Sequence, residues 1–146
     1  MISLGPRAST PASPTPRLKE ERAGTPAVPG SGFRFAGYAA LFDRVDRGGD
    51  VVRQGAFGRP KRVPVLLEHD RARAVGWAEV AEDARGLRAV GRVGVSVAAG
   101  SGLSFGYRVR RARVAGGVRE LAQVELVEVS LVGEPMQPGA RVLKVI

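Results

Sequence analysis

The chain has 146 residues, a formal net charge of +9 and no cysteine. The lack of cysteine excludes disulfides, thiolate nucleophiles and cysteine-ligated zinc or iron–sulfur sites. No apolar run reaches the roughly 18 residues that a membrane span needs, and the N-terminus lacks the apolar stretch of a signal peptide. We therefore expect a cytoplasmic chain with no membrane partner.

Residues 1–32 are rich in Pro, Ser, Thr, Ala and Gly, with Thr-Pro and Ser-Pro pairs between residues 10 and 26. Such a segment buries too little apolar area to offset the entropy that ordering it would cost. We predict a disordered tail or linker over residues 1–32 and one globular domain over residues 33–146.

Short apolar segments alternate with glycine-containing breaks after this tail, and several of them show the period-two pattern of strands. The predicted strands cover residues 33–42, 63–68, 75–80, 87–95, 103–114 and 118–132. Helix candidates are few and short, at residues 55–59 and near Ala98. The pattern predicts a mostly β domain, built as a barrel or a sandwich.

His69 is the single histidine of the chain. Any mechanism that needs an imidazole base near neutral pH must therefore use it. It follows an apolar run, residues 63–67, which would deliver it to the edge of the domain. A lone histidine is more often structural than catalytic, so this assignment needs partners.

The segment Gly102–Gly106 places Ser104 between two glycines in a G-x-S-x-G pattern. Glycine lets a backbone approach a substrate closely and offer N–H groups to an oxyanion. In an α/β-hydrolase a helix would follow the serine and the histidine would come late in the chain. Here residues 107–114 alternate like a strand and His69 comes first, which excludes that fold. Ser104 remains a candidate nucleophile, with an ordinary turn serine as the alternative.

A third group should orient the imidazole, and residues 124–131 offer Glu128. Counting by twos places Glu128 on the same strand face as Val124 and Leu126, and a carboxylate buried there needs a charged or hydrogen-bonded partner. The partner could be an imidazolium or one of the many arginines. Asp70, beside the histidine, competes as the orienting group, and Ser130 is a second serine in this region.

Taken together, these residues resemble the phage prohead maturation proteases, in motif order, over about residues 33–146. The motifs that carry the resemblance are Phe35, Gly37-Tyr38-Ala39, Phe42, Asp50, Gly55-Ala56-Phe57, Val63-Pro64-Val65-Leu66, His69-Asp70, Gly76, Gly86-Leu87, Gly91, Gly102-Leu103-Ser104-Phe105-Gly106-Tyr107, Glu128-Val129-Ser130-Leu131-Val132 and Pro135-Met136. The combination is far more specific than any single motif.

The resemblance implies a β-barrel like that of herpesvirus assemblin. It also implies a serine endopeptidase that trims the major capsid protein or its scaffolding segment inside an assembling procapsid, in the cytoplasm of a bacterial host. Phages and gene transfer agents use such proteins. Carried over by position, the nucleophile is Ser104, the histidine is His69, and Glu128 is our choice for the third member. No cofactor and no metal are expected. Residues 93–101 are shorter than the matching stretch in the family, so its helix should be shortened or lost.

Two other functions remain open. A degenerate protease domain could act as an assembly scaffold for the capsid protein, although it would need neither His69 nor Ser104. A basic β-barrel could bind nucleic acid, but the arginines are spread along the chain and only Phe105 and Tyr107 lie near the cluster at residues 108–113, so we expect no nucleic-acid partner. The sequence leaves open whether the chain forms a homo-oligomer.

Overall fold

The computed structural model describes residues 2–3 and 32–146, and within them it contains nine strands and no helix. The strands are β1 (Ile2–Ser3), β2 (Phe33–Leu41), β3 (Asp50–Val52), β4 (Lys61–Leu67), β5 (Asp70–Glu82), β6 (Gly86–Val93), β7 (Gly102–Ala115), β8 (Val118–Val132) and β9 (Val142–Val145). The prediction of a mostly β domain is confirmed.

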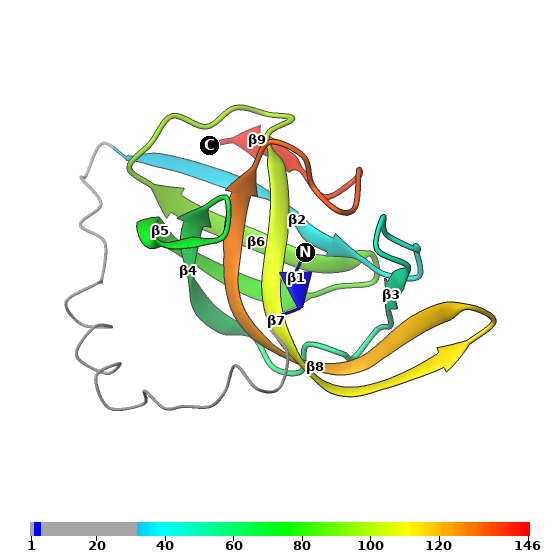
Figure 1. Cartoon of the computed structure of the whole chain (residues 1–146). Coiled ribbons are helices and arrows are strands. Elements are labelled where there is room, and N and C mark those ends of the chain that lie inside the picture. Colours follow the sequence, from blue (N-terminus) through cyan, green and yellow to red (C-terminus); the bar gives the residue numbers. More distant parts are fainter. Residues whose placement is uncertain (1, 4–31) are drawn as a thin grey trace.

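All strands belong to one curled sheet with the order β1-β7-β8-β4-β5-β6-β2-β9, and β3 pairs with β8 outside this path (Figure 1). The two ends of the order approach each other at the start of β7. There Gly102 forms a bridge with Arg141, and the Leu103 N–H donates to the Ala140 carbonyl at 2.9 Å. The sheet therefore curls into a barrel that is joined at this seam by a few backbone contacts.

Every predicted strand is present, and β8 spans the predicted residues 118–132. The sequence missed β3 and β9, which contain three and four residues. Segments of three or four residues are too short to show a period of two. Their extended conformation depends on pairing with neighbouring strands: β3 pairs with β8, and β9 pairs with β2. It also missed β1, whose residues Ile2 and Ser3 lie in the predicted tail. Residues 1 and 4–31 lie outside the described residues, so the division at residue 32 stays a prediction.

The two predicted short helices are wrong. Residues 55–59 form a turn in which Gly55 and Gly58 have φ angles of 94° and 74°, which an α-helix cannot contain. The segment around Ala98 is also a turn, in which the Ser101 N–H donates to the Ala98 carbonyl at 3.0 Å. The stretch between His69 and Ser104 therefore contains no helix, as the short sequence there predicted. No helix of the described residues could cross a membrane.

An aromatic cluster forms the centre of the core beneath β7. Phe105 packs edge-to-face on Phe57, with ring centroids 5.1 Å apart, and lies 4.8 Å from the ring of Tyr107. Leu126 and Val129 of β8 join the same buried cluster. Aromatic side chains contribute large buried areas, so this cluster holds β7 and β8 firmly in register.

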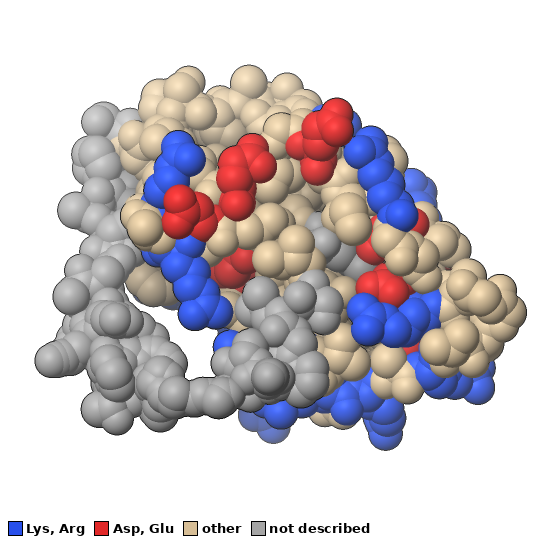
Figure 2. Space-filling view, viewed as in Figure 1, with Lys and Arg blue, Asp and Glu red and all other residues tan. Residues whose placement is uncertain are grey.

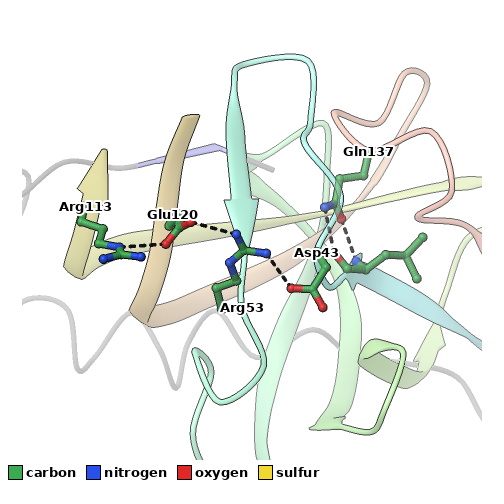
Figure 3. Close-up of polar contacts among 6 residues, drawn as sticks. Asp43, Arg53, Arg113, Glu120 and Gln137 are labelled. Atoms are coloured by element: carbon green, nitrogen blue, oxygen red, sulfur yellow. Dashed lines mark hydrogen bonds and ion pairs between the residues drawn. The ribbon is translucent and has the colours of Figure 1, made fainter. Parts of the chain in front are cut away.

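Polar contacts fix the loops that surround this core (Figure 3). The buried amide of Gln137 accepts from the Leu41 N–H at 2.8 Å and donates to the Leu41 carbonyl at 3.0 Å. Arg53 bridges Asp43 and Glu120, with both ion pairs at 2.8 Å. The first contact secures the C-terminal segment to β2, and the second secures the loop after β3 to β8.

Candidate active site

Three neighbouring strands bring the predicted site residues together. In the sheet β8 lies between β7, which carries Ser104, and β4, which leads into His69. Ser104 is opposite Ser130 of β8, and Leu66 of β4 is the partner of Ser130 on the other side. Residues more than 30 positions apart in the sequence therefore meet because β8 is their common neighbour.

His69 lies in a tight turn between β4 and β5. Leu67 pairs with Asp70, so the hairpin loop contains only Glu68 and His69, with φ angles of 47° and 61°. Two successive positive φ angles define a type I′ turn, which normally selects Asn or Gly. Glu68 and His69 adopt it at a conformational cost, so other contacts must hold the turn. Strain of this kind is common at functional sites.

The side chains of Ser104, His69 and Glu128 form a continuous hydrogen-bonded chain. His69 Nε2 lies 3.1 Å from Ser104 Oγ, and His69 Nδ1 lies 2.7 Å from Glu128 Oε2. A carboxylate can only accept, so Nδ1 carries the proton and the lone pair of Nε2 faces the serine hydroxyl. Ser104 and Glu128 are 2% and 3% exposed. The site is therefore largely shielded from bulk water, which strengthens electrostatic interactions within it.

A β-bulge in β8 decides where Glu128 points. Gly106 pairs with Glu128, whereas the next residue, Tyr107, pairs with Leu126, so Val127 is the extra residue. Phe105 and Tyr107 share the core face of β7, and so do their partners on β8, whereas Glu128 lies on the face of Ser104. The prediction that Glu128 shares a face with Leu126 is wrong. The bulge breaks the period of two and turns the carboxylate toward the histidine.

The two glycines of the G-x-S-x-G pattern lie in strand β7, which begins at Gly102, so Ser104 is a strand residue and not the turn serine of the alternative interpretation. A Cβ on Gly106 would overlap Oε2 of Glu128 and lie 2.8 Å from its Cδ. A Cβ on Gly102 would lie 2.6 Å from the Val132 carbonyl oxygen and 2.9 Å from Cδ of Pro135. Neither glycine has a positive φ, so the backbone conformation does not require glycine at these two positions. The reason is lack of space for a side chain, and at Gly106 that space is filled by Glu128.

Asp70, the competing orienting group, is not joined to the imidazole. Its Oδ1 accepts the Ala72 N–H at 2.9 Å at an exposed position. Ser130, fully buried, contacts both other members of the site: its hydroxyl donates to Glu128 Oε1 at 2.7 Å and accepts the His69 N–H at 3.1 Å. Sequence reasoning missed this double contact. In the sequence, the only sign of this contact is that Ser130 follows Glu128 by two positions on one strand.

Tyr107, Asp50 and Arg119 form a second group of polar contacts. The Tyr107 hydroxyl donates to Asp50 Oδ2 at 3.1 Å, and Arg119 holds both oxygens of Asp50 at 2.9 and 2.8 Å. Burial, together with the charge of Asp50, raises the pKa of Tyr107, so this phenol stays neutral and acts as a donor. Within residues 2–3 and 32–146, no three His, Cys, Asp or Glu side chains are grouped to hold a metal ion.

Sequence comparison decides the family. The family model described as caudovirus prohead serine protease matches residues 21–145, which is most of the chain. The chain belongs to the caudovirus prohead serine protease family. This agrees with the resemblance carried by the sequence motifs and with the serine-protease class predicted from them. The search of curated proteins found no match.

Solved structures similar to this prohead protease family member include herpesvirus proteases. A KSHV protease in complex with a hexapeptide phosphonate inhibitor has 14% identity and a TM-score of 0.48, and the match covers 77% of this chain and 64% of that one. The varicella-zoster virus protease has 15% identity and a TM-score of 0.40, with 66% and 58% covered. The chain thus spans less than two thirds of the length of these proteins.

Proposed function

We propose that this chain is a serine endopeptidase that cleaves the major capsid protein or its scaffolding segment during procapsid maturation of a phage or a gene transfer agent. Ser104 is the nucleophile, His69 the general base and Glu128 the orienting carboxylate. The observation that carries the proposal is the unbroken chain of contacts from Ser104 Oγ through both ring nitrogens of His69 to Glu128, at 3.1 and 2.7 Å. Family membership supports the reaction class and the capsid as substrate.

The geometry suits acyl transfer. His69 Nε2 takes the proton of Ser104 as its Oγ attacks the peptide carbonyl, and then returns the proton to the leaving amine. Water hydrolyses the resulting acyl-enzyme by the same base catalysis. Glu128 holds the Nδ1–H tautomer and stabilises the imidazolium that forms in each step. Backbone N–H groups near Ser104 are our candidates for oxyanion donors.

The alternative function is a degenerate protease domain that acts as an assembly scaffold. The short helix-free stretch between His69 and Ser104 motivates it. The intact hydrogen-bonded chain argues against it, because a scaffold does not need a buried carboxylate aligned on an imidazole. The nucleic-acid reading is weaker. Arg110 and Arg113 of the β7–β8 hairpin pair with Glu125 and Glu120, and acidic side chains lie among basic ones over the upper part of the face shown in Figure 2. Pairing of this kind weakens the focused positive field that binds polyanions.

The test is intact-mass analysis of the matching capsid precursor after co-expression with this chain. Ser104→Ala and His69→Ala variants are run beside it, and Ser101→Ala, in the loop before β7, serves as a matched serine control. We expect one defined truncation with the unchanged chain and with Ser101→Ala, and an intact precursor with the other two. If the precursor stays whole in every case while particles still need the chain to assemble, the protease proposal fails and the scaffold reading replaces it.

A further inference from the structure

Ser130 is a buried hydroxyl between two members of the proposed triad. It is 0% exposed and lies opposite Ser104 on the strand next to β7. Its single hydrogen goes to Glu128 Oε1 at 2.7 Å, and its oxygen accepts the backbone N–H of His69 at 3.1 Å. A buried hydroxyl has few arrangements that satisfy it, so both partners are fixed relative to it.

The two contacts act on different degrees of freedom. The contact with Glu128 fixes the rotation of the carboxylate, so that Oε2 faces Nδ1 of His69. The contact with the His69 N–H holds the strained turn, in which Glu68 and His69 both have positive φ angles. The Glu68 N–H is held by the Leu131 carbonyl at 3.0 Å, also on β8. Residues of β8 therefore set the position of the histidine as well as of its carboxylate.

We infer that Ser130 is a positioning residue of the proposed catalytic reaction. Its hydroxyl aligns Glu128 and His69 before substrate binds, and this alignment matters most when the imidazole becomes charged in the transition state. This inference rests on the proposed function, and it assigns to Ser130 a role that it exerts through Glu128 and His69.

Three variants test it: Ser130→Ala removes the hydroxyl, Ser130→Thr retains it, and Ser101→Ala is the matched control. For Ser130→Ala we expect kcat to fall by about 10–100-fold, the range seen when a hydrogen-bond partner that orients a metal-ligating histidine or carboxylate is lost, with KM unchanged. Ser130→Thr should recover most of kcat if it folds. Unchanged kcat in Ser130→Ala overturns the inference.

A spectroscopic measurement separates positioning from general stability. His69 is the only histidine, so the proton on its Nδ1 gives a single imidazole resonance without overlap. In Ser130→Ala we expect this resonance to move upfield or broaden while the rest of the spectrum shows a folded chain. An unchanged resonance in folded Ser130→Ala overturns the inference even if kcat falls. This measurement needs no cleavage. It therefore tests the positioning role of Ser130 even in a chain that has no protease activity.

A different observation concerns the outer edge of β7. On this edge β1 runs parallel to β7, with Ile2 paired to Gly106 and Ser3 paired to Tyr107 (Figure 1). Leu103, nearer the start of β7, donates its N–H to Ala140 on the same edge. Alternate residues of a strand point the same way, so the N–H groups of Phe105 and Tyr107 also face β1. Backbone from this chain therefore flanks Ser104 on both sides.

An open strand edge beside a nucleophile is a binding place for an extended peptide, since unpaired N–H and C=O groups accept a further strand. Here β1 uses part of that edge, and Ser104 is only 2% exposed. We propose that Ile2–Ser3 competes with the substrate for the β7 edge, so that the N-terminus restrains the enzyme until a substrate strand displaces it. This also rests on the proposed function.

A chain lacking Ile2–Ser3 tests the competition, with a chain lacking Ala12–Ser13 as the control of equal length. The first deletion should lower KM about threefold or more with kcat unchanged, because a tethered competitor acts at an effective concentration on the order of millimolar. The control should match the full chain. Equal KM values for the two deletions overturn the proposal.

Hydrogen exchange measures the pairing of β1 with β7 without a cleavage assay. The amides of Phe105 and Tyr107 should exchange faster in the chain lacking Ile2–Ser3 than in the control. Equal exchange rates show that β1 does not occupy the edge. If Ser104→Ala abolishes cleavage while exchange and KM are the same in both deletions, the protease proposal stands and this one alone fails.

Discussion

Gly106 of β7 and Glu128 of β8 face each other directly, and the carboxylate of Glu128 fills the space that a side chain on Gly106 would need. The glycine that completes the G-x-S-x-G pattern is therefore a packing requirement of the third site residue. Glycine is needed at position 106 because Glu128 of the partner strand fills the space beside it. Backbone flexibility at Gly106 is not the reason.

Gly106→Ala should displace Glu128 from His69. The added Cβ would lie 2.8 Å from Cδ of Glu128, so the carboxylate or the strands must move. We expect a loss of about 1–3 kcal/mol in stability and a fall of about 10²-fold in kcat. Gly133→Ala is the control, because its Cβ would meet only Oε2 of Glu68 at an ordinary 3.6 Å. Normal kcat in Gly106→Ala would contradict the packing argument. Urea unfolding and cleavage kinetics measure the two effects.

Glu128→Gln should nearly abolish cleavage while leaving the fold intact. A glutamine amide can donate to Nδ1 of His69 and so hold the wrong tautomer, which in a comparable triad lowers kcat by about 10⁴-fold. Asp70→Asn is the matched control, since Asp70 is exposed and its carboxylate accepts the Ala72 N–H. We expect it to leave kcat unchanged. The opposite ranking of the two variants in a cleavage assay would make Asp70 the orienting group.

Phe105→Ala should destabilise the domain strongly. Phe105 is fully buried between Phe57 and Tyr107, and removal of such a ring costs about 3–5 kcal/mol. This is a large part of the stability of a small domain. Phe33→Ala, at a 40% exposed position, should cost about 1 kcal/mol or less. Urea midpoints measured for both variants test the assignment of the core, which fails if the two losses are equal.

Glu120 should make a stabilising contribution that disappears in acid. Hydrogen bonds from Arg53 and then Arg113 hold the pKa of Glu120 below its ordinary value. A carboxyl whose pKa is lowered by folding stabilises the fold above its unfolded pKa, and the contribution is lost as pH falls through the folded pKa. Glu120→Gln should therefore be less stable than the unchanged chain at pH 7, and the difference should shrink as pH falls below the ordinary pKa of a glutamate. Thermal unfolding across this range measures it.

Glu134→Gln is the control for that titration. Its ion pair with Arg47 is longer, at 3.4 Å, and its side chain is 81% exposed. Exposed pairs of this kind contribute little. A stability difference for Glu120→Gln that stays constant down to pH 3 would show that the carboxylate charge is not its source.

The strands of the barrel could be predicted because their signal is local. Apolar and polar residues alternate in parts of β8, over residues 123–126 and 128–131, and the glycine-containing breaks separate its neighbours. The chemistry of the site could also be proposed from residue types: one histidine, one serine between glycines and one carboxylate in an apolar strand.

The sequence by itself thus determined the β class of the domain and the identities of His69, Ser104 and Glu128 as candidates. Only the tertiary structure decided which strand face Glu128 occupies, because the bulge at Val127 depends on pairing with β7. It likewise decided the role of Ser130 and the place of Ile2–Ser3. These features arise from contacts between residues far apart in the chain, and no local pattern encodes the register of one strand against another.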